Sequence, residues 1–123
     1  MIQIETQLLA IDKLGILKGK CIHVYRGFYK KTTATTGDKI LVSIRKRNAT
    51  KMTLKKKTNQ AILAHVNIFC RRLSGNYYRF DNNGFLTLHT DGSYRGGSLR
   101  KPLPRELFFS SLKDAGFLTV ALF

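Results

Sequence analysis

Apolar and polar residues alternate along residues 2–11, 18–31 and 40–47, and residues 60–70 form a longer apolar run. Alternation of this kind is typical of half-buried β-strands, because successive side chains of a strand point to opposite faces of a sheet. Gly27 interrupts the second stretch, since a glycine inside a strand weakens it. The pattern therefore predicts a series of short strands over the first two thirds of the chain.

Turn-forming residues separate these stretches. They occur at Asp12–Gly15, Thr35–Lys39, Ser74–Gly75, Asn82–Gly84, Asp91–Gly92 and Gly96–Gly97. Glycine, asparagine and aspartate suit turns because they tolerate backbone conformations that other residues avoid. Short strands joined by turns about every 8–12 residues suggest a small closed barrel, and so a mainly β fold.

The pattern changes after Pro102. Apolar residues from Leu107 onward recur at helical spacing, and Pro104 suits the first turn of a helix. We therefore expect a short C-terminal helical segment over about residues 103–123. No linker or internal repeat divides the sequence, so residues 1–123 are predicted to form one domain.

Positive charge is the strongest feature of the composition. The chain has 22 Lys+Arg and 7 Asp+Glu, a formal net charge of +15, and 13 of these cations lie in residues 18–57. Such an excess repels itself unless a polyanion neutralises it, and nucleic acid does so with release of counterions. The alternatives are a merely solvated basic surface and an anionic membrane surface, and no basic amphipathic helix favours the membrane.

Two basic segments are predicted to contact RNA. Residues 25–31 interleave aromatic residues with cations, so that bases can stack while phosphates are held. Packing of these aromatic residues in the core is the alternative. Residues 45–57 contain seven cations and no acid, and we expect them to form a loop.

The third basic segment, residues 71–84, is predicted to be a β-hairpin. Alternation places Tyr78 toward the core and Tyr77 and Arg79 toward solvent, a side that the pair Arg71–Arg72 extends. Guanidinium groups match phosphate oxygens and stack on bases. This hairpin is therefore expected to present arginine to RNA.

The predicted contacts follow from these segments and from the cations near the C-terminus. The predicted RNA-binding residues are Arg26, Lys30, Lys31, Arg45, Lys46, Arg47, Lys51, Lys55, Lys56, Lys57, Arg71, Arg72, Arg79, Arg95, Arg100 and Lys101. The possible base-stacking residues are Tyr25, Phe28, Tyr29 and Tyr77.

No active site is visible in the sequence. The seven carboxylates form no close pair, and the common nucleophile, phosphate-loop and zinc-protease motifs are missing. Cys21, Cys70 and the three histidines are too scattered for a zinc site, so we predict reduced thiols, no metal and no cofactor. His65 is expected to be structural or RNA-facing. No apolar run is long enough to span a bilayer, and neither a membrane nor a small-molecule partner is predicted.

The segment "RRLSGNYYRFDNNG", preceded by "AILA", resembles the signature region of the universal large-subunit ribosomal protein fourteen family. In that family an apolar strand leads to two arginines, a glycine turn and an aromatic-Arg-Phe-Asp-x-Asn stretch. The matching residues are Arg71, Arg72, Gly75, Arg79, Phe80, Asp81 and Asn82. Further likeness occurs at "MIQIETQL", Asp12, Gly15, Cys21, Gly37-Asp38, Pro102 and Arg105–Leu107.

The resemblance implies a five-stranded β-barrel with projecting basic hairpin and loops and a short helical C-terminal part. It also implies a non-enzymatic, structural constituent of the large ribosomal subunit, which binds large-subunit rRNA and supports the subunit interface during translation. Family members neighbour ribosomal proteins three and nineteen and help to form a bridge to small-subunit rRNA, so we expect these partners.

Departures from the family pattern bear on the source. "HVNI" at residues 65–68 replaces a basic run, and Arg100 and Lys101 are added in a normally more apolar segment. This drift, the many Ile, Phe, Asn and Lys residues and the lack of a leader favour a mitochondrial member acting in the matrix. The bacterial cytoplasm is the alternative.

Two other functions compete with the ribosomal one. A free single-stranded RNA-binding protein or RNA chaperone on a small barrel would need an open aromatic stacking platform. A nucleic-acid enzyme would need a catalytic site, which the sequence does not offer.

Overall fold

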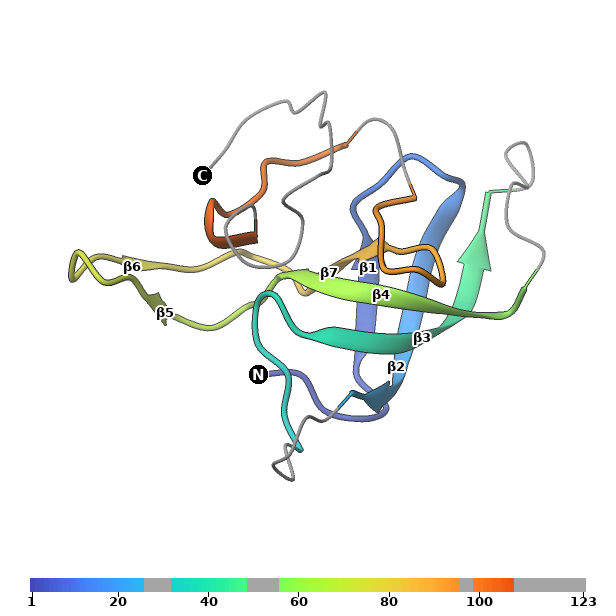
Figure 1. Cartoon of the computed structure of the whole chain (residues 1–123), viewed down its shortest axis with the longest axis horizontal. Coiled ribbons are helices and arrows are strands. Elements are labelled where there is room, and N and C mark those ends of the chain that lie inside the picture. Colours follow the sequence, from blue (N-terminus) through green and yellow to red (C-terminus); the bar gives the residue numbers. More distant parts are fainter. Residues whose placement is uncertain (26–31, 49–55, 96–98, 108–123) are drawn as a thin grey trace.

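The computed structural model of the chain describes residues 1–25, 32–48, 56–95 and 99–107. Five strands close into a barrel in the order β1-β2-β3-β4-β7 (Figure 1). Their bounds are Gln7–Ala10 for β1, Ile16–Val24 for β2, Lys39–Arg47 for β3, Thr58–His65 for β4 and Gly84–Thr87 for β7. The predicted mainly β fold with a small closed five-stranded barrel is confirmed.

One parallel pair closes a ring of otherwise antiparallel strands. β2 pairs with β1 and β3, and β4 with β3 and β7, all antiparallel. The closing pair joins β1 to β7 in parallel, from Leu9–Ala10 to Gly84–Phe85. A methyl group added at Gly19 would collide with Val42 Cγ1 and lie 3.1 Å from the Phe85 ring. Glycine at this position of β2 therefore lets the barrel close around Phe85.

The barrel interior is an apolar core to which every strand of the ring contributes. Its large buried side chains include Leu8, Ile16, Ile40, Leu63 and Phe85. Burying one side chain of this size stabilises the fold by about 1.5–3 kcal/mol. The interior is therefore a major source of the stability of the domain.

A second apolar layer covers the outer face of β4 and β7. There, Ile62 and Leu86 pack with Leu99, Leu103 and Leu107 of the C-terminal segment, the name used here for residues 99–107. Both faces of β4 are therefore buried, which explains why its sequence is a continuous apolar run rather than an alternating one.

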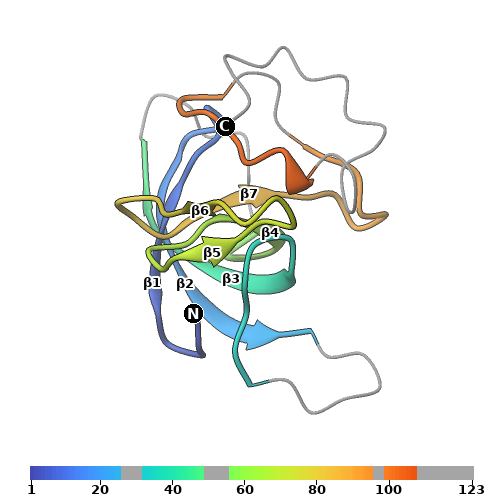
Figure 2. The ribbon, with the colours of Figure 1, turned by 90° about the vertical axis from the view of Figure 1, so that its left-hand side faces the viewer.

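Two short strands form a separate hairpin that projects from the barrel (Figure 1). They are β5, Cys70–Arg71, and β6, Tyr77–Tyr78, and the turn between them contains Gly75 with a φ of 89°. Figure 2 looks from the hairpin toward the barrel, with the C-terminal segment above the hairpin. The predicted projecting hairpin is present.

The predicted strand at residues 60–70 is wrong at its end. β4 ends at His65, and the chain leaves the barrel before β5 begins. Asn67 N donates to the side-chain oxygen Oδ1 of Asn83 at 2.9 Å. A strand at this position would instead donate to a backbone carbonyl of a neighbouring strand. Apolar content alone does not distinguish a residue inside the barrel from one on the connection to the hairpin.

The predicted strand at residues 2–11 is also shorter than expected, because β1 begins only at Gln7. Ile2 instead bridges to Ala34, with backbone hydrogen bonds of 2.9 and 2.7 Å. Glu5 has a φ of 78°, a conformation that interrupts an extended chain.

Two other predictions are settled only in part. Residues 45–47 belong to β3, so the predicted loop at residues 45–57 is wrong at its start, and residues 49–55 lie outside the described residues. Glu106 and Leu107 have helical backbone and are the only helical residues among those described. The rest of the predicted helical segment and the turn at Gly96–Gly97 lie outside the described residues.

Candidate nucleic-acid interface

Three hollows on the outside of the barrel gather most of the described cations that were predicted as RNA contacts. The first contains Arg45, Arg47 and Lys57, the second Lys56 and Arg95, and the third Lys46, Arg100 and Lys101. Among the described residues that line these hollows, none is aspartate or glutamate. A concave surface lined by one sign of charge focuses its field and favours anionic ligands.

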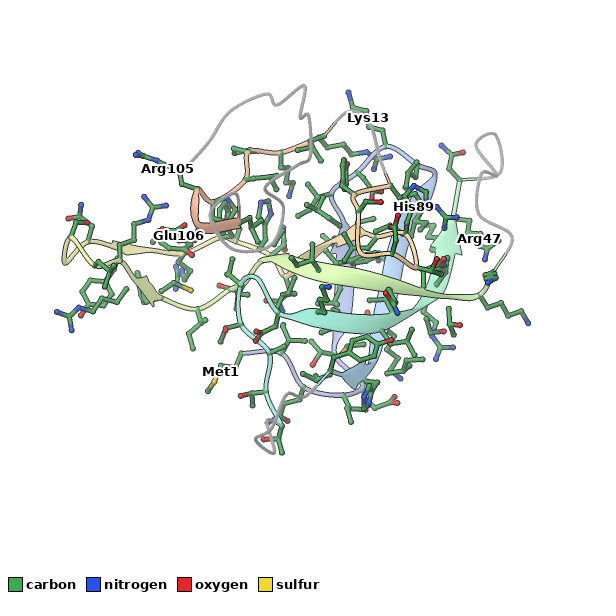
Figure 3. All side chains as sticks on the ribbon, in the orientation of Figure 1. Met1, Lys13, Arg47, His89, Arg105 and Glu106 are labelled. Carbon is green, nitrogen blue, oxygen red and sulfur yellow. The ribbon has the colours of Figure 1, made fainter. Side chains whose placement is uncertain are left out.

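The first hollow lies at the end of β3. Its backbone is held where Ile44 N donates to Lys57 O at 2.8 Å. Arg47, labelled in Figure 3 on the side opposite the hairpin, donates from Nη2 to the Lys56 carbonyl oxygen at 2.8 Å. The exposed side chains of Arg45 and Lys57 are therefore carried on a fixed backbone.

The second hollow brings together Tyr25, Lys56 and Arg95, three predicted residues that are far apart in the sequence. It has a volume of about 420 Å³ and lies between the end of β2 and the turn of residues 88–95, near His89 in Figure 3. Each residue was predicted on its own, but their proximity depends on strand order and is not visible in the sequence.

The third hollow has a cationic rim over an apolar floor. Lys18 joins Lys46, Arg100 and Lys101 around a floor that includes Leu17. Sequence reasoning misses Lys18, because the register between β2 and β3 shifts around it and places Leu17 and Lys18 next to each other on the outside. Simple alternation does not reveal such a bulge.

The hairpin alternates largely as predicted. Tyr77 is 64% exposed and Tyr78 only 9% exposed, and Arg71 and Arg79 are exposed. The Arg79 guanidinium lies 4.9 Å from the centre of the Phe69 ring, an exposed aromatic residue within the predicted strand of residues 60–70. One side of the hairpin therefore presents two arginines and aromatic surface to solvent.

Arg72 does not extend this solvent-facing side, and that prediction is wrong. Its Nε lies 2.7 Å from Glu106 Oε1, and its guanidinium lies 4.5 Å from the centre of the Tyr78 ring. The cause is alternation itself: Arg71 pairs with Tyr77, so the next residue shares the opposite face with Tyr78. Arg72 therefore links the hairpin to the C-terminal segment, and Figure 3 shows Glu106 beside the hairpin.

Two buried polar side chains, His65 and Asp12, join segments that are distant in the sequence. His65 Nε2 lies 2.7 Å from the Pro102 carbonyl oxygen, and its ring stacks on Phe80 with 3.9 Å between centroids. Burial lowers the pKa of His65, so the neutral imidazole donates from Nε2. Asp12 Oδ2 accepts from Thr87 N at 3.1 Å, and burial raises the pKa of Asp12. The structural contact expected of His65 is observed, and RNA contact by His65 stays a prediction.

The described part of the chain offers no clustered metal ligands. It contains no group of three or more His, Cys, Asp or Glu placed to hold a metal ion. Cys21, whose pKa is raised by burial, and Cys70 are both free thiols. Within the described ranges, no helix is long and apolar enough to cross a membrane.

Some predicted residues are not placed by the structure. Arg26, Phe28, Tyr29, Lys30, Lys31, Lys51 and Lys55 lie outside the described residues. Their contacts stay predictions, as does RNA contact by the described cations.

Comparison with known families agrees with the fold and with the basic surface. The sequence model of the family described as ribosomal protein L14p/L23e matches residues 1–118. The match includes the barrel, the projecting hairpin and the C-terminal segment. Members of this family are structural proteins of the large ribosomal subunit, where they lie among rRNA and other ribosomal proteins, and they are normally not enzymes. The chain belongs to the ribosomal protein L14p/L23e family.

Proposed function

We propose that the chain binds large-subunit rRNA through the three hollows and the exposed side of the hairpin, as a non-enzymatic constituent of the subunit. One observation carries this proposal. Nine cations line the three hollows, and none of the described lining residues is acidic. The net charge of +15 destabilises the compact state of the isolated chain, because its cations repel one another. RNA phosphates relieve this repulsion when they bind.

The barrel acts as a rigid support in this function. Its closed ring has no free strand edge, so those cations that belong to β2 and β3 are carried on backbone paired within the ring. Because the hollows lie on different parts of the outer surface, each can hold a different RNA segment. Catalysis of a reaction is not part of this role, which is to keep adjacent RNA segments in register.

The departures from the family pattern support continued binding at the third hollow. His65 stands where the family has a basic run, and it lines the third hollow together with Arg100 and Lys101. The cations that the family carries at residues 65–68 are missing here, and Arg100 and Lys101 supply two cations on the other side of the hollow. We infer that the RNA contact has moved by a short distance along this surface.

We further propose that the hairpin supports the subunit interface and contacts neighbours. Ile68, Leu73 and Tyr77 are exposed apolar side chains on a projecting element, a feature typical of interaction surfaces. The neighbours implied by the family resemblance are ribosomal proteins three and nineteen and, through a bridge, small-subunit rRNA. Cross-linking of intact ribosomes tests this proposal. Cross-links from the hairpin to none of these three neighbours, but to different ribosomal proteins, would contradict it.

We propose that the chain belongs to the large subunit of a mitochondrial ribosome. The support is compositional: many Ile, Phe, Asn and Lys residues, and drift from the family pattern at residues 65–68 and 100–101. Mass spectrometry of large subunits purified from mitochondria of the source should detect the chain. Its presence only in cytoplasmic ribosomes would contradict this location.

Sucrose-gradient sedimentation tests the central proposal. We expect the chain to travel with the large subunit and to leave it at high salt. A free RNA chaperone, the competing function, would stay near the top of the gradient. With purified chain and rRNA, neutralisation of roughly six phosphates predicts a log–log salt slope of about −4 to −5, and a flat response contradicts RNA binding.

Charge variants locate the contact. Lys46→Gln and Arg100→Gln in the third hollow should each reduce the salt slope by about 1. Lys13→Gln is the matched control, because Lys13 is exposed and lines none of the three hollows. Equal losses in all three variants would mean that the hollows are not the site.

A further inference from the structure

The second hollow has the size and lining of a site for one nucleotide. Its volume of about 420 Å³ lies in the range of small-molecule pockets. One wall is Tyr25, and the other is the turn of residues 88–95, which an antiparallel bridge closes at its base. The two formally charged residues that line it, Lys56 and Arg95, are both positive.

The floor of the hollow is fixed by the register of three strands. His23 of β2 pairs with Leu41 of β3, and Leu41 pairs with Gln60 of β4. The side chains of Leu41 and Gln60 therefore lie next to each other on the outer face. The Gln60 carbonyl oxygen accepts from Leu88 N at 2.9 Å, which holds the far wall. The floor thus offers an apolar contact beside a carboxamide that can donate to and accept from a base edge.

Tyr25 is a preformed surface for stacking. Its backbone N donates to Lys39 O at 3.2 Å, which keeps it in line with the β2–β3 ladder. Its ring meets that of His23 at 89°, with 5.3 Å between centroids, and the side chain is still 40% exposed. The contact fixes the orientation of the ring and leaves surface on which a base can stack.

One buried side chain holds both the backbone of Lys56 and the guanidinium of Arg95. Asn59 donates from Nδ2 to the Lys56 carbonyl oxygen at 3.2 Å, and its Oδ1 accepts from Arg95 Nη1 at 3.4 Å. Asp91, the only carboxylate in the nearby turn, accepts instead from Ser93 N at 2.9 Å and from Ser93 Oγ at 2.7 Å. The Arg95 guanidinium and a Lys56 held by its backbone therefore line a hollow that no carboxylate of the described residues enters.

We propose that the second hollow holds one unpaired nucleotide of the bound RNA, with its base on Tyr25, its base edge at Gln60 and its flanking phosphates at Lys56 and Arg95. This inference rests on the proposed function, because it names a subsite of the RNA surface. Bases within a duplex are covered by their neighbours, so the site selects a bulged or loop nucleotide. A free nucleotide has the same base chemistry, but only a polymer supplies a phosphate on each side to match the two cations.

The test uses the full chain and two RNA hairpins that differ by one unpaired adenosine in the stem. We expect the bulged hairpin to bind roughly fivefold to a hundredfold more tightly, the range of a single base–aromatic stack. Tyr25→Leu should remove this preference and Tyr25→Phe should retain it. Ile4→Ala, which truncates an exposed apolar side chain outside the three hollows and the hairpin, should leave the preference unchanged. Thermal unfolding checks that each variant is folded.

The salt dependence separates the possible outcomes. Tyr25→Leu should keep the wild-type salt slope, because no phosphate contact is removed. Equal binding of both hairpins by the wild-type chain, with a steep salt dependence, overturns the nucleotide site and leaves the proposed function intact. Loss of salt-dependent binding to both hairpins and to large-subunit rRNA overturns the proposed function instead.

Adenosine monophosphate distinguishes a nucleotide of RNA from a free one. It should displace the bulged hairpin only at concentrations far above those of the hairpin itself, because it lacks the second flanking phosphate. Tight binding of adenosine monophosphate without any preference for the bulge overturns the assignment to RNA.

Discussion

The barrel interior and the apolar layer beneath the C-terminal segment are both well buried, but they differ in chemistry. The described core of the interior is made of apolar side chains from all five strands. The outer layer is bordered by the buried polar side chains of Asp12 and His65, which bond to neighbouring chain segments. The ring is therefore stabilised mainly by apolar burial, whereas attachment of the C-terminal segment also depends on specific hydrogen bonds and protonation states.

Truncation of the interior should have the largest effect. Phe85→Ala removes the largest fully buried side chain among the described residues and should lower the unfolding free energy by about 3–5 kcal/mol, measured by urea denaturation. Leu73→Ala, at the fully exposed tip of the hairpin, should change it by less than about 0.5 kcal/mol. Similar losses in the two variants would mean that the interior is not the main core.

Truncation of the outer layer should have a smaller and more local effect. Leu103→Ala should cost about 2–3 kcal/mol, toward the low end for buried leucine, since a layer at the surface can partly collapse. Hydrogen exchange should accelerate at residues 99–107 while β2 and β3 stay protected. Leu103→Met should retain most of the stability. Acceleration spread evenly over the barrel would show that the two layers unfold as one.

The effect of pH should be smaller again and should fall on the outer layer. Burial, with a lesser contribution from Lys101, lowers the pKa of His65, so the unfolded chain takes up its proton first as the pH falls. The stability that neutral His65 provides is complete above about pH 6.5 and is lost as the pH falls toward the folded pKa. Urea denaturation between pH 7.5 and 5 should show this loss, as these conditions span roughly the titration of histidine.

His65→Gln is the variant that checks this assignment, because glutamine can still donate to Pro102 O but does not titrate. It should flatten the profile. The comparison is best made in an Asp12→Asn background. Burial raises the pKa of Asp12, so its contribution has the opposite sign: it is present below about pH 4 and is lost as the pH rises through the folded pKa. An unchanged profile in His65→Gln would assign the effect to another group.

The ion pair that joins the hairpin to the C-terminal segment should have the smallest effect. A double-mutant cycle with Arg72→Met and Glu106→Gln should give a coupling energy of about 0.2–1 kcal/mol, because both side chains are partly exposed. The coupling should weaken in high salt. A coupling energy near zero at low salt would mean that the ion pair does not help to attach the C-terminal segment. The attachment would then depend on the apolar contacts of Leu99, Leu103 and Leu107.

Strands β1, β2 and β3 of the ring were predictable because alternation is a local signal. Ile40 and Val42, for example, lie on the buried face that their spacing predicts. The limits of the strands were not, because they depend on long-range contacts: Asn67 bonds to Asn83, and Ile2 pairs with Ala34. The covered outer face of β4 was equally hidden, since its partners lie some forty residues later in the chain.

In the candidate site, too, some features were predictable from the sequence and others were not. Composition and charge runs predicted most of its cations, including Arg45, Lys56 and Arg95. They could not assign Arg72 to an ion pair, because Glu106 is distant in sequence. Lys18 was missed since a bulge, rather than a charge run, brings it beside Lys46. Chemical type is thus readable from the chain, and grouping comes from the strand order.

The parallel closure between Leu9–Ala10 and Gly84–Phe85 has a consequence for synthesis. The ring cannot be completed until its last strand has left the exit tunnel of the translating ribosome. At about 5–20 residues per second, the cations of β2 and β3 emerge on the order of seconds earlier. The newborn chain therefore meets nearby RNA first as an open polycation, and shielding it during that interval protects it from premature, misplaced association.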